Sequence, residues 1–572
     1  MFPTHCTYVT RVSLLTQFIN ISHAVFTYKH FRRTCSIYFN GIVPFRGYLS
    51  LKNKITKTNK SNKYESYKSG AFKLMIAGLI VRLFGFANRI YMSNLIGAEG
   101  MGLYQLTFPV YSLIILTLTS GVSITVSGMA AKERALGRVK GARRAAKAAF
   151  FLLLFAGSVA AAAMMLFGKQ IANDLLGDSR TYLSLLLLAP CIPIVASASA
   201  IKGYFYGMAR VTPTAISQIT EQIVRILFIV FLSQKIAGTN LTYACAILTL
   251  SSAVGEMANL LVVAVAFFKY SKEDGHSGKM TFRELRRTSG QIAKESAPIS
   301  LNRFIVSVMG TVETIILPLR FIAGGLNYQS SLAMLGRLSG MAMPLIMFPT
   351  IVTSSLSTTL VPAVAGALAS GHRRLAQQRI SRCIRISCLM GFFFFGFFTT
   401  FGVQVGDMLY AGQHTGKLLQ KMAIYCVIVY LQQTMTGILN GLEKHGFALF
   451  STSVGYAIRM SFIWFAVPVK GVNAYIAGML ISSAVTAIIN LVYIVKNIGI
   501  QIEFAEWLVK PFCIGLIINV SGNFMMTSAL SNFKYGWLLA CGIASFLSLG
   551  VALLTKTIKL TDIKTGKLCK SN

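Results

Sequence analysis

Charged residues are scarce in this chain, and acidic residues are the scarcest of them. Only 13% of the 572 residues are charged, with 17 Asp and Glu against 55 Lys and Arg, whereas 54% are hydrophobic. A soluble domain carries about 25% charged residues, so this composition has too little charge to cover a water-facing surface. It excludes a soluble enzyme, a disordered scaffold and a nucleic-acid-binding protein, and it indicates a polytopic membrane protein.

Residue patterns that carry chemistry in soluble enzymes are also missing. The ten cysteines include no C-x-x-C spacing, and the seven histidines all fall outside the apolar runs, so neither a disulfide framework nor a zinc site is predicted. The chain has no phosphate-binding loop of the Walker type. We therefore predict no catalytic residue, no metal site and no cofactor, and we expect that the protein is not an enzyme.

Long apolar runs make up most of the sequence. A membrane-crossing helix needs ~20 mostly apolar residues, and the alternation typical of strands is absent. The sequence therefore predicts an all-α polytopic membrane protein with about 14 transmembrane helices. The predicted spans are roughly 71–96, 103–130, 148–168, 181–201, 213–234, 241–268, 297–322, 333–365, 386–406, 419–440, 447–468, 472–495, 508–527 and 535–555.

Positive charge is distributed unevenly between the connections. With the N-terminus inside, the predicted inner connections hold 29 Lys and Arg, and the outer connections hold six. This asymmetry predicts a multi-pass protein of the cytoplasmic membrane with both termini in the cytoplasm. Basic loops that lie against an anionic inner leaflet also explain the net charge of +38. Anionic membrane lipids, and no nucleic acid, are therefore the expected partners of these charges.

The first 69 residues differ from the rest because they are basic and contain no apolar span. They hold eleven Lys and Arg and lack an apolar segment followed by a small-residue cleavage site. We expect a dispensable extension, or a start site placed too far upstream. A membrane-surface anchor is the alternative.

An internal repeat relates two parts of the chain at a constant offset of 234 residues. The matched pairs include Gly102 and Gly336, Ser123 and Ser357, Gly207 and Gly441, Ser217 and Ser451, and Arg225 and Arg459. Since each half has six spans that start on the same side, we expect parallel repeats related by an axis along the membrane normal. The predicted parts are the extension 1–69, an N-lobe 70–268, a basic cytoplasmic linker 269–295, a C-lobe 296–497, and helices thirteen and fourteen with a basic cytoplasmic tail in 498–572.

Arginines outnumber acids within the apolar spans. Charged side chains there are costly and usually face a cavity or a partner, and guanidinium groups suit the geometry of phosphate. Seven arginines against three acids therefore predict a cavity for an anionic ligand. The residues are Arg82, Arg89, Glu221, Arg225, Glu256, Arg303, Glu313, Arg320, Arg337 and Arg459.

Three of these arginines are candidates for the cavity wall. Arg82 and Arg89 are seven residues apart on one helix face, and Arg337 lies between two glycines. An alternative position for Arg89 is the outer interface. Arg303 and Arg320 lie near span ends, where long basic side chains reach toward the interface.

The remaining charges have two interpretations. Glu221 and Arg225 show the i, i+4 spacing of an intrahelical ion pair. Glu256 and Glu313 are candidates either for ion coupling or for pairing with neighbouring arginines.

Short motifs in both halves resemble those of the lipid II flippases, which belong to the multidrug/oligosaccharidyl-lipid/polysaccharide (MOP) exporter superfamily. One segment, with the charged residues that follow it, is similar more specifically to the stage V sporulation protein B branch. The resemblance covers about residues 70–555 and implies a MATE-like fold with 14 helices. The general motifs are 82–87, 95–98, 336–338, 359–362 and 369–371, and the segment specific to the branch is 212–218, followed by Glu221, Gln222 and Arg225.

The resemblance implies roles for particular residues. Arg82 and Arg337 match positions where the flippases place cavity arginines that contact the diphosphate of the substrate. The second arginine of the family's first helix would fall at Asn88, with Arg89 as its neighbour. A shift of one residue turns a helix position by about 100°, so this departure implies either a different substrate or a different angle of approach for Arg89.

The function that follows is a flippase for a lipid-linked diphosphate oligosaccharide, a peptidoglycan or polysaccharide precursor, working by alternating access in spore cortex or cell-wall synthesis. Its expected partners are that anionic precursor and, as candidates, cell-wall synthesis enzymes. A cation-coupled multidrug antiporter of the same superfamily is the first alternative. A membrane polysaccharide polymerase or ligase is the second, although the longest outer connections have only about a dozen residues each.

Overall fold

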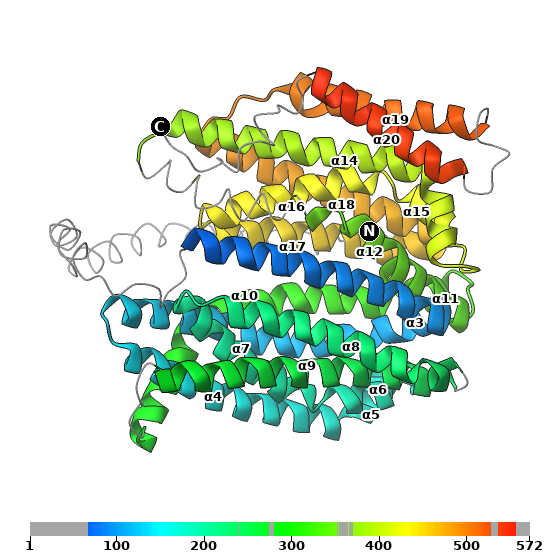
Figure 1. Cartoon of the computed structure of the whole chain (residues 1–572). Coiled ribbons are helices and arrows are strands. Elements are labelled where there is room, and N and C mark those ends of the chain that lie inside the picture. The colour runs from blue at the N-terminus through cyan, green and yellow to red at the C-terminus, as the bar shows by residue number, and fades with distance from the viewer. Residues whose placement is uncertain are drawn as a thin grey trace, which may run out of the picture. The chain divides into compact units, whose positions relative to one another are not determined.

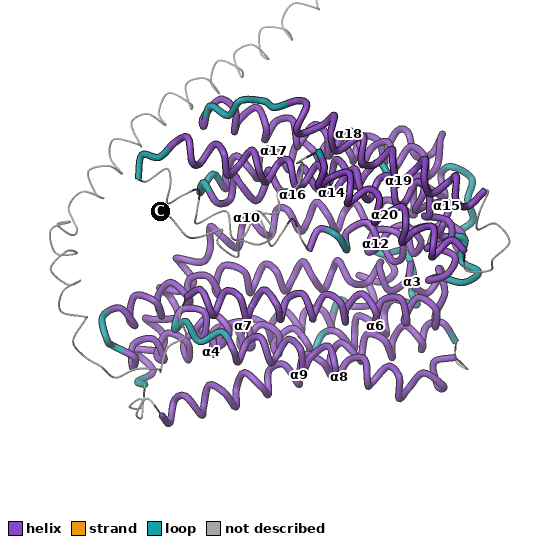
Figure 2. The backbone as a smooth tube through the Cα atoms, turned by 45° about the horizontal axis from the view of Figure 1, so that its top comes forward, coloured by secondary structure: helices purple, strands orange, loops and turns teal. Residues whose placement is uncertain are grey.

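Helices form the regular structure of this protein. The computed structural model describes residues 67–555 apart from 238–239, 274–279, 352, 354–363, 365–369 and 528–535. In this part of the chain no residue lies in a β-strand, and Figure 2 shows helices joined by short loops. The all-α fold predicted from the sequence is confirmed. The predicted extension 1–69 lies almost entirely outside the described residues.

The N-terminal half, residues 67–273, comes first in Figure 1 in blue to green. Its helices are α3 (Tyr67–Ala135), α4 (Val139–Leu166), α5 (Gly168–Gln170), the π-helical turn η2 (Ile171–Leu175), α6 (Thr181–Leu188), α7 (Cys191–Gly207), α8 (Thr212–Ala237) and α9 (Leu241–Glu273).

The C-terminal half, residues 282–498, runs from green to orange in Figure 1 and is followed by two further helices. Its elements are α10 (Phe282–Ala323), α11 (Tyr328–Leu335), the π-helical turn η3 (Gly336–Ala342), α12 (Met343–Met347), α14 (Arg373–Leu409), α15 (Thr415–Lys421), α16 (Tyr425–Gly441), α17 (His445–Ser461), η4 (Phe462–Ala466) and α18 (Val467–Ile498). After it come η5 (Ala505–Val509), α19 (Lys510–Thr527) and α20 (Gly536–Leu554).

The helices are long enough to account for the predicted number of spans. Among the described residues, eleven helical segments and one bent pair are apolar and long enough to cross a membrane. Two of the eleven contain a glycine with a left-handed backbone, Gly97 (φ 67°) and Gly471 (φ 57°), which breaks each into two helices. Glycine adopts this conformation at little steric cost. The resulting segments are consistent with the predicted fourteen.

Several helices run past the predicted ends of the apolar runs. The connection expected at 202–212 is helical as far as Gly207, and the one expected at 366–385 is helical from Arg373. Apolar composition marks only the part of a helix that lies in hydrocarbon, whereas backbone hydrogen bonding continues as long as the sequence permits. At the start of α10 a capping box sets the end instead, because the side chains of Thr281 and Glu284 each accept a hydrogen bond from the other's backbone N–H.

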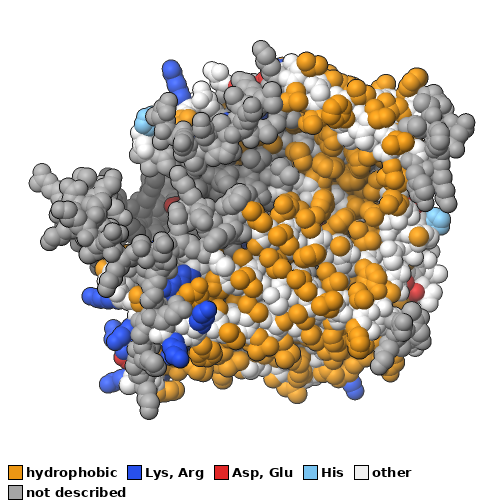
Figure 3. Space-filling view, in the orientation of Figure 1, with side chains coloured by type: hydrophobic (Ala, Val, Ile, Leu, Met, Phe, Trp, Pro, Cys, Tyr) orange, Lys and Arg blue, Asp and Glu red, His pale blue; other side chains and the backbone are white. Residues whose placement is uncertain are grey.

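The surface carries the apolar side chains expected of a membrane protein. Figure 3 shows hydrophobic side chains spread over the face in view, with Lys and Arg gathered at its left end. Phe231 is 85% exposed and Phe546 is 77% exposed, so large aromatic side chains point outward instead of into a core. Contiguous exposed apolar surface of this kind suits contact with lipid. This is a multi-pass membrane protein.

Candidate functional site

The π-helical turn η3 is a meeting point of the two halves. The Arg89 guanidinium donates to the backbone carbonyl of Ser339 at 3.3 Å, and the Gln105 amide donates to the same carbonyl at 2.9 Å. Arg337 belongs to this turn, and among the described residues its buried Nε has no hydrogen-bond partner. π-Helical turns within helices are frequent at functional sites. The structure therefore gathers Arg89, Gln105 and Arg337 around one turn.

Two glycines allow the halves to approach closely beside this turn. A Cβ atom on Gly102 would lie 2.0 Å from the carbonyl oxygen of Leu332, and one on Gly336 would lie 2.0 Å from that of Ala98. The residues that meet here are repeat equivalents, 234 positions apart in the sequence: Ala98 and Leu332, and Gly102 and Gly336. The hydrogen-bonded residues Gln105 and Ser339 are separated by the same offset. The crossing is thus built from equivalent positions of the repeat, which supports the predicted parallel halves.

Arg82 and Asn88 occupy different surroundings. Arg82 is exposed and lies seven residues before Arg89 in α3, which corresponds to about 10 Å along the axis. Asn88, at the position where the flippases would have arginine, is buried and donates to the Met92 sulfur at 3.5 Å. Of the two arginines in the first helix, the structure brings Arg89 to the turn that holds Arg337.

A charged cluster lies inside the N-terminal half. Arg225 contacts Glu221 at 2.9 Å and Glu256 at 4.0 Å. The side-chain amide of Asn259 donates to both carboxylates, at 3.1 Å to Glu221 and 3.0 Å to Glu256. The predicted i, i+4 ion pair is therefore present, and the second acid shares its arginine. This arrangement can hold the charges as an ion-pair network or exchange a cation with the carboxylates.

A related pair lies inside the C-terminal half. Arg459, which corresponds to Arg225 in the repeat, contacts Glu313 of α10 at 3.3 Å, and Tyr475 donates to the same carboxylate at 3.0 Å. Arg459 also donates to the hydroxyls of Ser482 and Ser483, at 3.1 and 3.5 Å. Both arginines shared by the repeat are thus ion-paired, each with a glutamate placed differently in the sequence.

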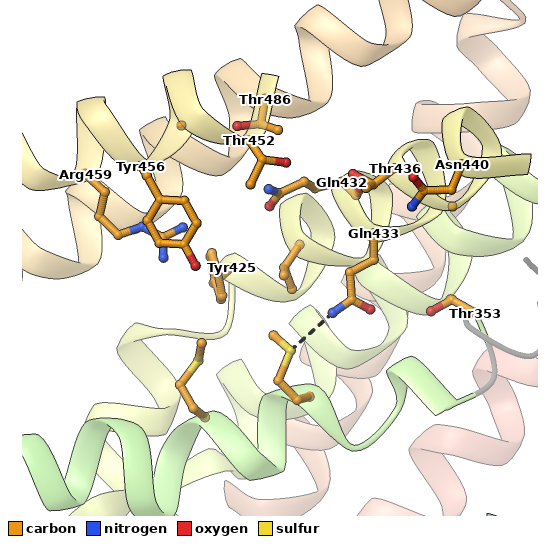
Figure 4. A pocket seen from close by; sticks show the side chains of 15 residues that line it. Thr353, Tyr425, Gln432, Gln433, Thr436, Asn440, Thr452, Tyr456, Arg459 and Thr486 are labelled. Atoms are coloured by element: carbon orange, nitrogen blue, oxygen red, sulfur yellow. Dashed lines mark hydrogen bonds between the residues drawn. The ribbon is translucent and has the colours of Figure 1, made fainter. Parts of the chain in front are cut away.

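A pocket of about 540 Å³ opens next to Arg459. Figure 4 shows that its labelled polar side chains come mainly from α16 and α17, with Thr486 from α18 and Thr353. Two methionines of the segment that follows η3, Met343 and Met347, complete an apolar part of the wall. The polar lining residues are Thr353, Tyr425, Gln432, Gln433, Thr436, Asn440, Thr452, Tyr456, Arg459 and Thr486.

A second set of polar contacts joins the halves at the end of the molecule where α3 bends at Gly97. Arg180 contacts Asp178 and Glu99, both at 2.8 Å, and the Tyr328 hydroxyl donates to Asp178 at 2.8 Å. Burial would raise the pKa of Asp178, but hydrogen bonds from Arg180 and Tyr328 outweigh it and hold the pKa below its ordinary value of 3.8. A carboxylate with a lowered pKa keeps its stabilising contacts above its ordinary pKa and loses them only as the pH falls through the lowered value.

Further contacts close the same end. Asn94 donates to the carbonyl of Leu409 at 2.9 Å, and the backbone N–H of Ala98 donates to the side chain of Gln413 at 2.9 Å. These contacts link the first helix of the N-terminal half to the C-terminal half at this end of the molecule.

Sequence reasoning missed several polar residues of these sites. The inner connection predicted at 202–212 includes Lys202, but this residue lies within α7, where it interacts electrostatically with Glu221 and Glu256. Asn259 could have been found, because it follows Glu256 by one helical turn within an apolar run. Among the described residues, no group of three or more His, Cys, Asp or Glu could hold a metal ion.

Comparisons with known proteins agree on the class of protein. A family model described as polysaccharide biosynthesis protein matches residues 68–367. Stage V sporulation protein B of Bacillus subtilis (strain 168) is 24% identical over 500 residues, which cover 86% of this chain and 94% of that protein. The lipid II flippase MurJ of the same organism is 24% identical over 422 residues, which cover 68% of this chain and 75% of that protein.

Solved structures show the same fold. The inward-facing conformation of a multidrug resistance MATE family transporter of the MOP superfamily has a TM-score of 0.60 at 16% identity, covering 74% of this chain and 98% of that one. A MOP superfamily transporter from Pyrococcus furiosus has a TM-score of 0.58 at 16% identity, covering 77% of this chain and 99% of that one. These solved structures are described as transporters, and MurJ is described as a flippase. The chain belongs to the polysaccharide biosynthesis protein family, and it is similar to stage V sporulation protein B, to MurJ and, in its fold, to transporters of the MOP superfamily.

Proposed function

We propose that this membrane protein is a transporter, and specifically a flippase for a lipid-linked diphosphate oligosaccharide, a peptidoglycan or polysaccharide precursor used in spore cortex or cell-wall synthesis. The observation that carries the proposal is the pair of arginines at η3. Arg337 has a buried Nε without a partner among the described residues, and Arg89 reaches the same turn from the first helix. Guanidinium groups in a low-dielectric site form strong, directional hydrogen bonds with phosphate oxygens.

The proposed mechanism is alternating access between the two halves. Their close crossing at Gly102 and Gly336 is a pivot about which the halves rock, while the arginines beside it hold the diphosphate. The lipid tail stays in the bilayer during this movement. The contacts of Asp178, Tyr328 and Gln413 then close the outer end while the substrate enters from the cytoplasmic side.

The direct test is translocation of a fluorescent lipid-linked diphosphate oligosaccharide by the purified protein in liposomes. We expect the labelled head group to become accessible to an outside quencher only in liposomes that contain the protein. Absence of protein-dependent translocation, with the protein correctly inserted, would contradict the proposed function.

A cation-coupled multidrug antiporter is the second candidate. The observation that favours it is the cluster in the N-terminal half, where Asn259 bridges Glu221 and Glu256. Against it, Arg225 lies within 4.0 Å of both carboxylates. Uptake of a cationic dye driven by an ion gradient, measured in the same liposomes, distinguishes the two candidates.

The orientation of the protein is testable at the linker between the halves. The Lys and Arg asymmetry predicts that residues 269–295 face the cytoplasm. A Ser277→Cys variant, whose site lies outside the described residues, should resist a membrane-impermeant thiol reagent added to intact cells and react after the membrane is opened. Efficient labelling from outside would reverse the predicted orientation.

The closure of the outer end predicts a shift in conformation. Tyr328→Phe removes the hydroxyl that donates to Asp178, and a hydrogen bond to a charged group contributes about 1.5–3 kcal/mol. Spin labels at Lys169 and Lys417, one in each half, should therefore show a larger share of long distances in this variant than in the parent protein. Tyr243→Phe, at an exposed tyrosine of α9, is the matched control. An unchanged distance distribution in Tyr328→Phe would mean that the contact does not hold this end closed.

A further inference from the structure

We propose that the pocket beside Arg459 binds the saccharide part of the transported molecule, separately from the arginines that hold its diphosphate. This assignment rests on the proposed function, because it concerns the head group of that substrate. The pocket encloses about 540 Å³, within the range of roughly 300–1,000 Å³ typical of sites for small ligands.

The charge of the pocket suits a neutral ligand. Among the described lining residues Arg459 is the charged one, and its guanidinium is already bound to Glu313, Ser482 and Ser483. A diphosphate would need cations with free donors, and an organic cation would need a free carboxylate. With its arginine neutralised, the pocket favours an uncharged molecule that is rich in hydrogen-bonding groups.

The polar groups of α16 have unused hydrogen-bonding capacity. Within the described part of the chain, the Gln432 amide has no hydrogen bond, and the Gln433 amide contacts only the Met347 sulfur at 3.5 Å, drawn as the dashed line in Figure 4. An amide in a membrane-spanning helix is costly unless it faces a cavity or a partner. These two glutamines face the pocket, so a ligand that fills it would supply their partners.

The hydroxyl groups of the lining complement these amides. Thr436 donates to the carbonyl of Gln432 at 2.9 Å, and Thr452 donates to that of Ala448 at 2.7 Å. Each hydroxyl has therefore used its proton within its own helix. The Thr436 oxygen also accepts from the Asn490 amide at 3.3 Å, and both hydroxyl oxygens keep a lone pair for a ligand in the pocket. Amides that donate and accept, next to hydroxyl oxygens that accept, match sugar hydroxyl groups, which do both.

The internal repeat shows that the fold does not require this lining. The positions 234 residues before Gln432, Thr436 and Asn440 are Ala198, Lys202 and Tyr206. The N-terminal half thus forms the equivalent helix, α7, without an amide at these positions. By contrast, positions shared by both halves, such as Arg225 and Arg459, make ion pairs inside each half. The amides belong to the C-terminal half alone, which indicates a role in binding and not in packing.

The experiment compares two ligands that differ only in the saccharide. Binding of a lipid-linked diphosphate oligosaccharide and of the same lipid diphosphate without sugar is measured with purified parent protein and with Gln432→Leu, Gln433→Leu and the double variant. We expect the double variant to bind the saccharide-bearing ligand roughly tenfold more weakly, because two hydrogen bonds are lost. Binding of the sugar-free ligand should be unchanged. Asn523→Leu, at an exposed asparagine of α19 that does not line the pocket, is the matched control.

Each outcome has a distinct meaning. Equal binding of the saccharide-bearing ligand by parent and double variant would overturn the pocket assignment and leave the flippase proposal standing. An equal loss of both ligands would also overturn it, because the effect would not depend on the saccharide. Failure of the parent protein to bind either ligand would contradict the proposed function itself, and the pocket assignment with it.

A second measurement does not depend on leucine variants that fold. Thr436→Cys places a thiol in the pocket wall, and its modification by a small thiol reagent is followed at that residue by mass spectrometry. We expect the soluble oligosaccharide head group, freed of lipid and diphosphate, to slow the modification several-fold, and inorganic diphosphate to leave it unchanged. No protection by the oligosaccharide, or equal protection by diphosphate, would overturn the proposal.

Discussion

Arg337→Ala is expected to weaken binding of a lipid-linked diphosphate by roughly ten- to a hundred-fold. Hydrogen bonds to charged groups contribute about 1.5–3 kcal/mol, and each 1.4 kcal/mol is about a factor of ten in affinity. Arg337→Lys should be intermediate, because lysine keeps the charge but loses the bidentate geometry. The measurement is precursor binding by folded, purified protein.

The matched control for this prediction is another arginine of a membrane helix. The Arg320 guanidinium lies 4.7 Å from the centre of the Trp464 ring and donates to the backbone carbonyl of Trp464. Arg320→Ala therefore removes a guanidinium at a span end and leaves the residues of η3 unchanged. We expect its affinity to remain that of the parent protein. Affinity equal to the parent in Arg337→Ala would remove the proposed role of this arginine.

The other two candidate arginines refine the same test. Arg89→Ala also loses the bond to the Ser339 carbonyl, so its thermal stability must be measured beside its affinity. Arg82 lies about 10 Å further along α3. A large effect of Arg82→Ala on affinity would mean that the diphosphate sits closer to the predicted inner end than η3.

Gly336→Ala is expected to abolish transport or reduce it to a few per cent of the parent rate. Its new Cβ atom would lie 2.0 Å from the carbonyl oxygen of Ala98, a distance that forces the two helix backbones apart. Gly102→Ala should have a similar effect, because its Cβ would meet the carbonyl of Leu332 at the same distance. Since small residues let membrane helices approach closely, both variants lose the crossing about which the halves rock.

A glycine on the same long helix gives the control for this second prediction. A Cβ on Gly128 of α3 would have no atom within 4 Å, so Gly128→Ala should transport at the rate of the parent protein. Liposome translocation is the measurement, with insertion and thermal stability checked for each variant. Normal transport by Gly336→Ala and Gly102→Ala would show that the close crossing is not needed for the cycle.

Hydropathy and charge could predict the fold class because both depend on composition over long stretches. A run of ~20 apolar residues is long enough to cross a membrane wherever it packs, so the all-α multi-pass class is confirmed. The residues at which helices begin and end are less predictable from hydropathy. Hydropathy places Lys202 in a connection, for example, although α7 extends to Gly207. The reason is that hydropathy does not report where backbone hydrogen bonding stops.

The candidate site was only partly accessible to sequence reasoning. The i, i+4 spacing of Glu221 and Arg225 predicted a contact within one helix, and the structure contains it. The partner of Arg459 could not be predicted in this way, because Glu313 lies 146 residues away on another helix. Contacts between helices depend on how each helix is rotated about its axis, and one residue changes that rotation by about 100°.

The sequence by itself determined the membrane class, the internal repeat and the excess of arginine over acid within the spans. The tertiary structure alone decided that Arg89, rather than Arg82, reaches the turn of Arg337, and that Gln432 and Gln433 face a pocket with unused hydrogen-bonding capacity. The physical reason is that burial in lipid depends on the average character of a segment. A binding site instead depends on which faces of distant segments meet, and that is fixed only when the helices pack.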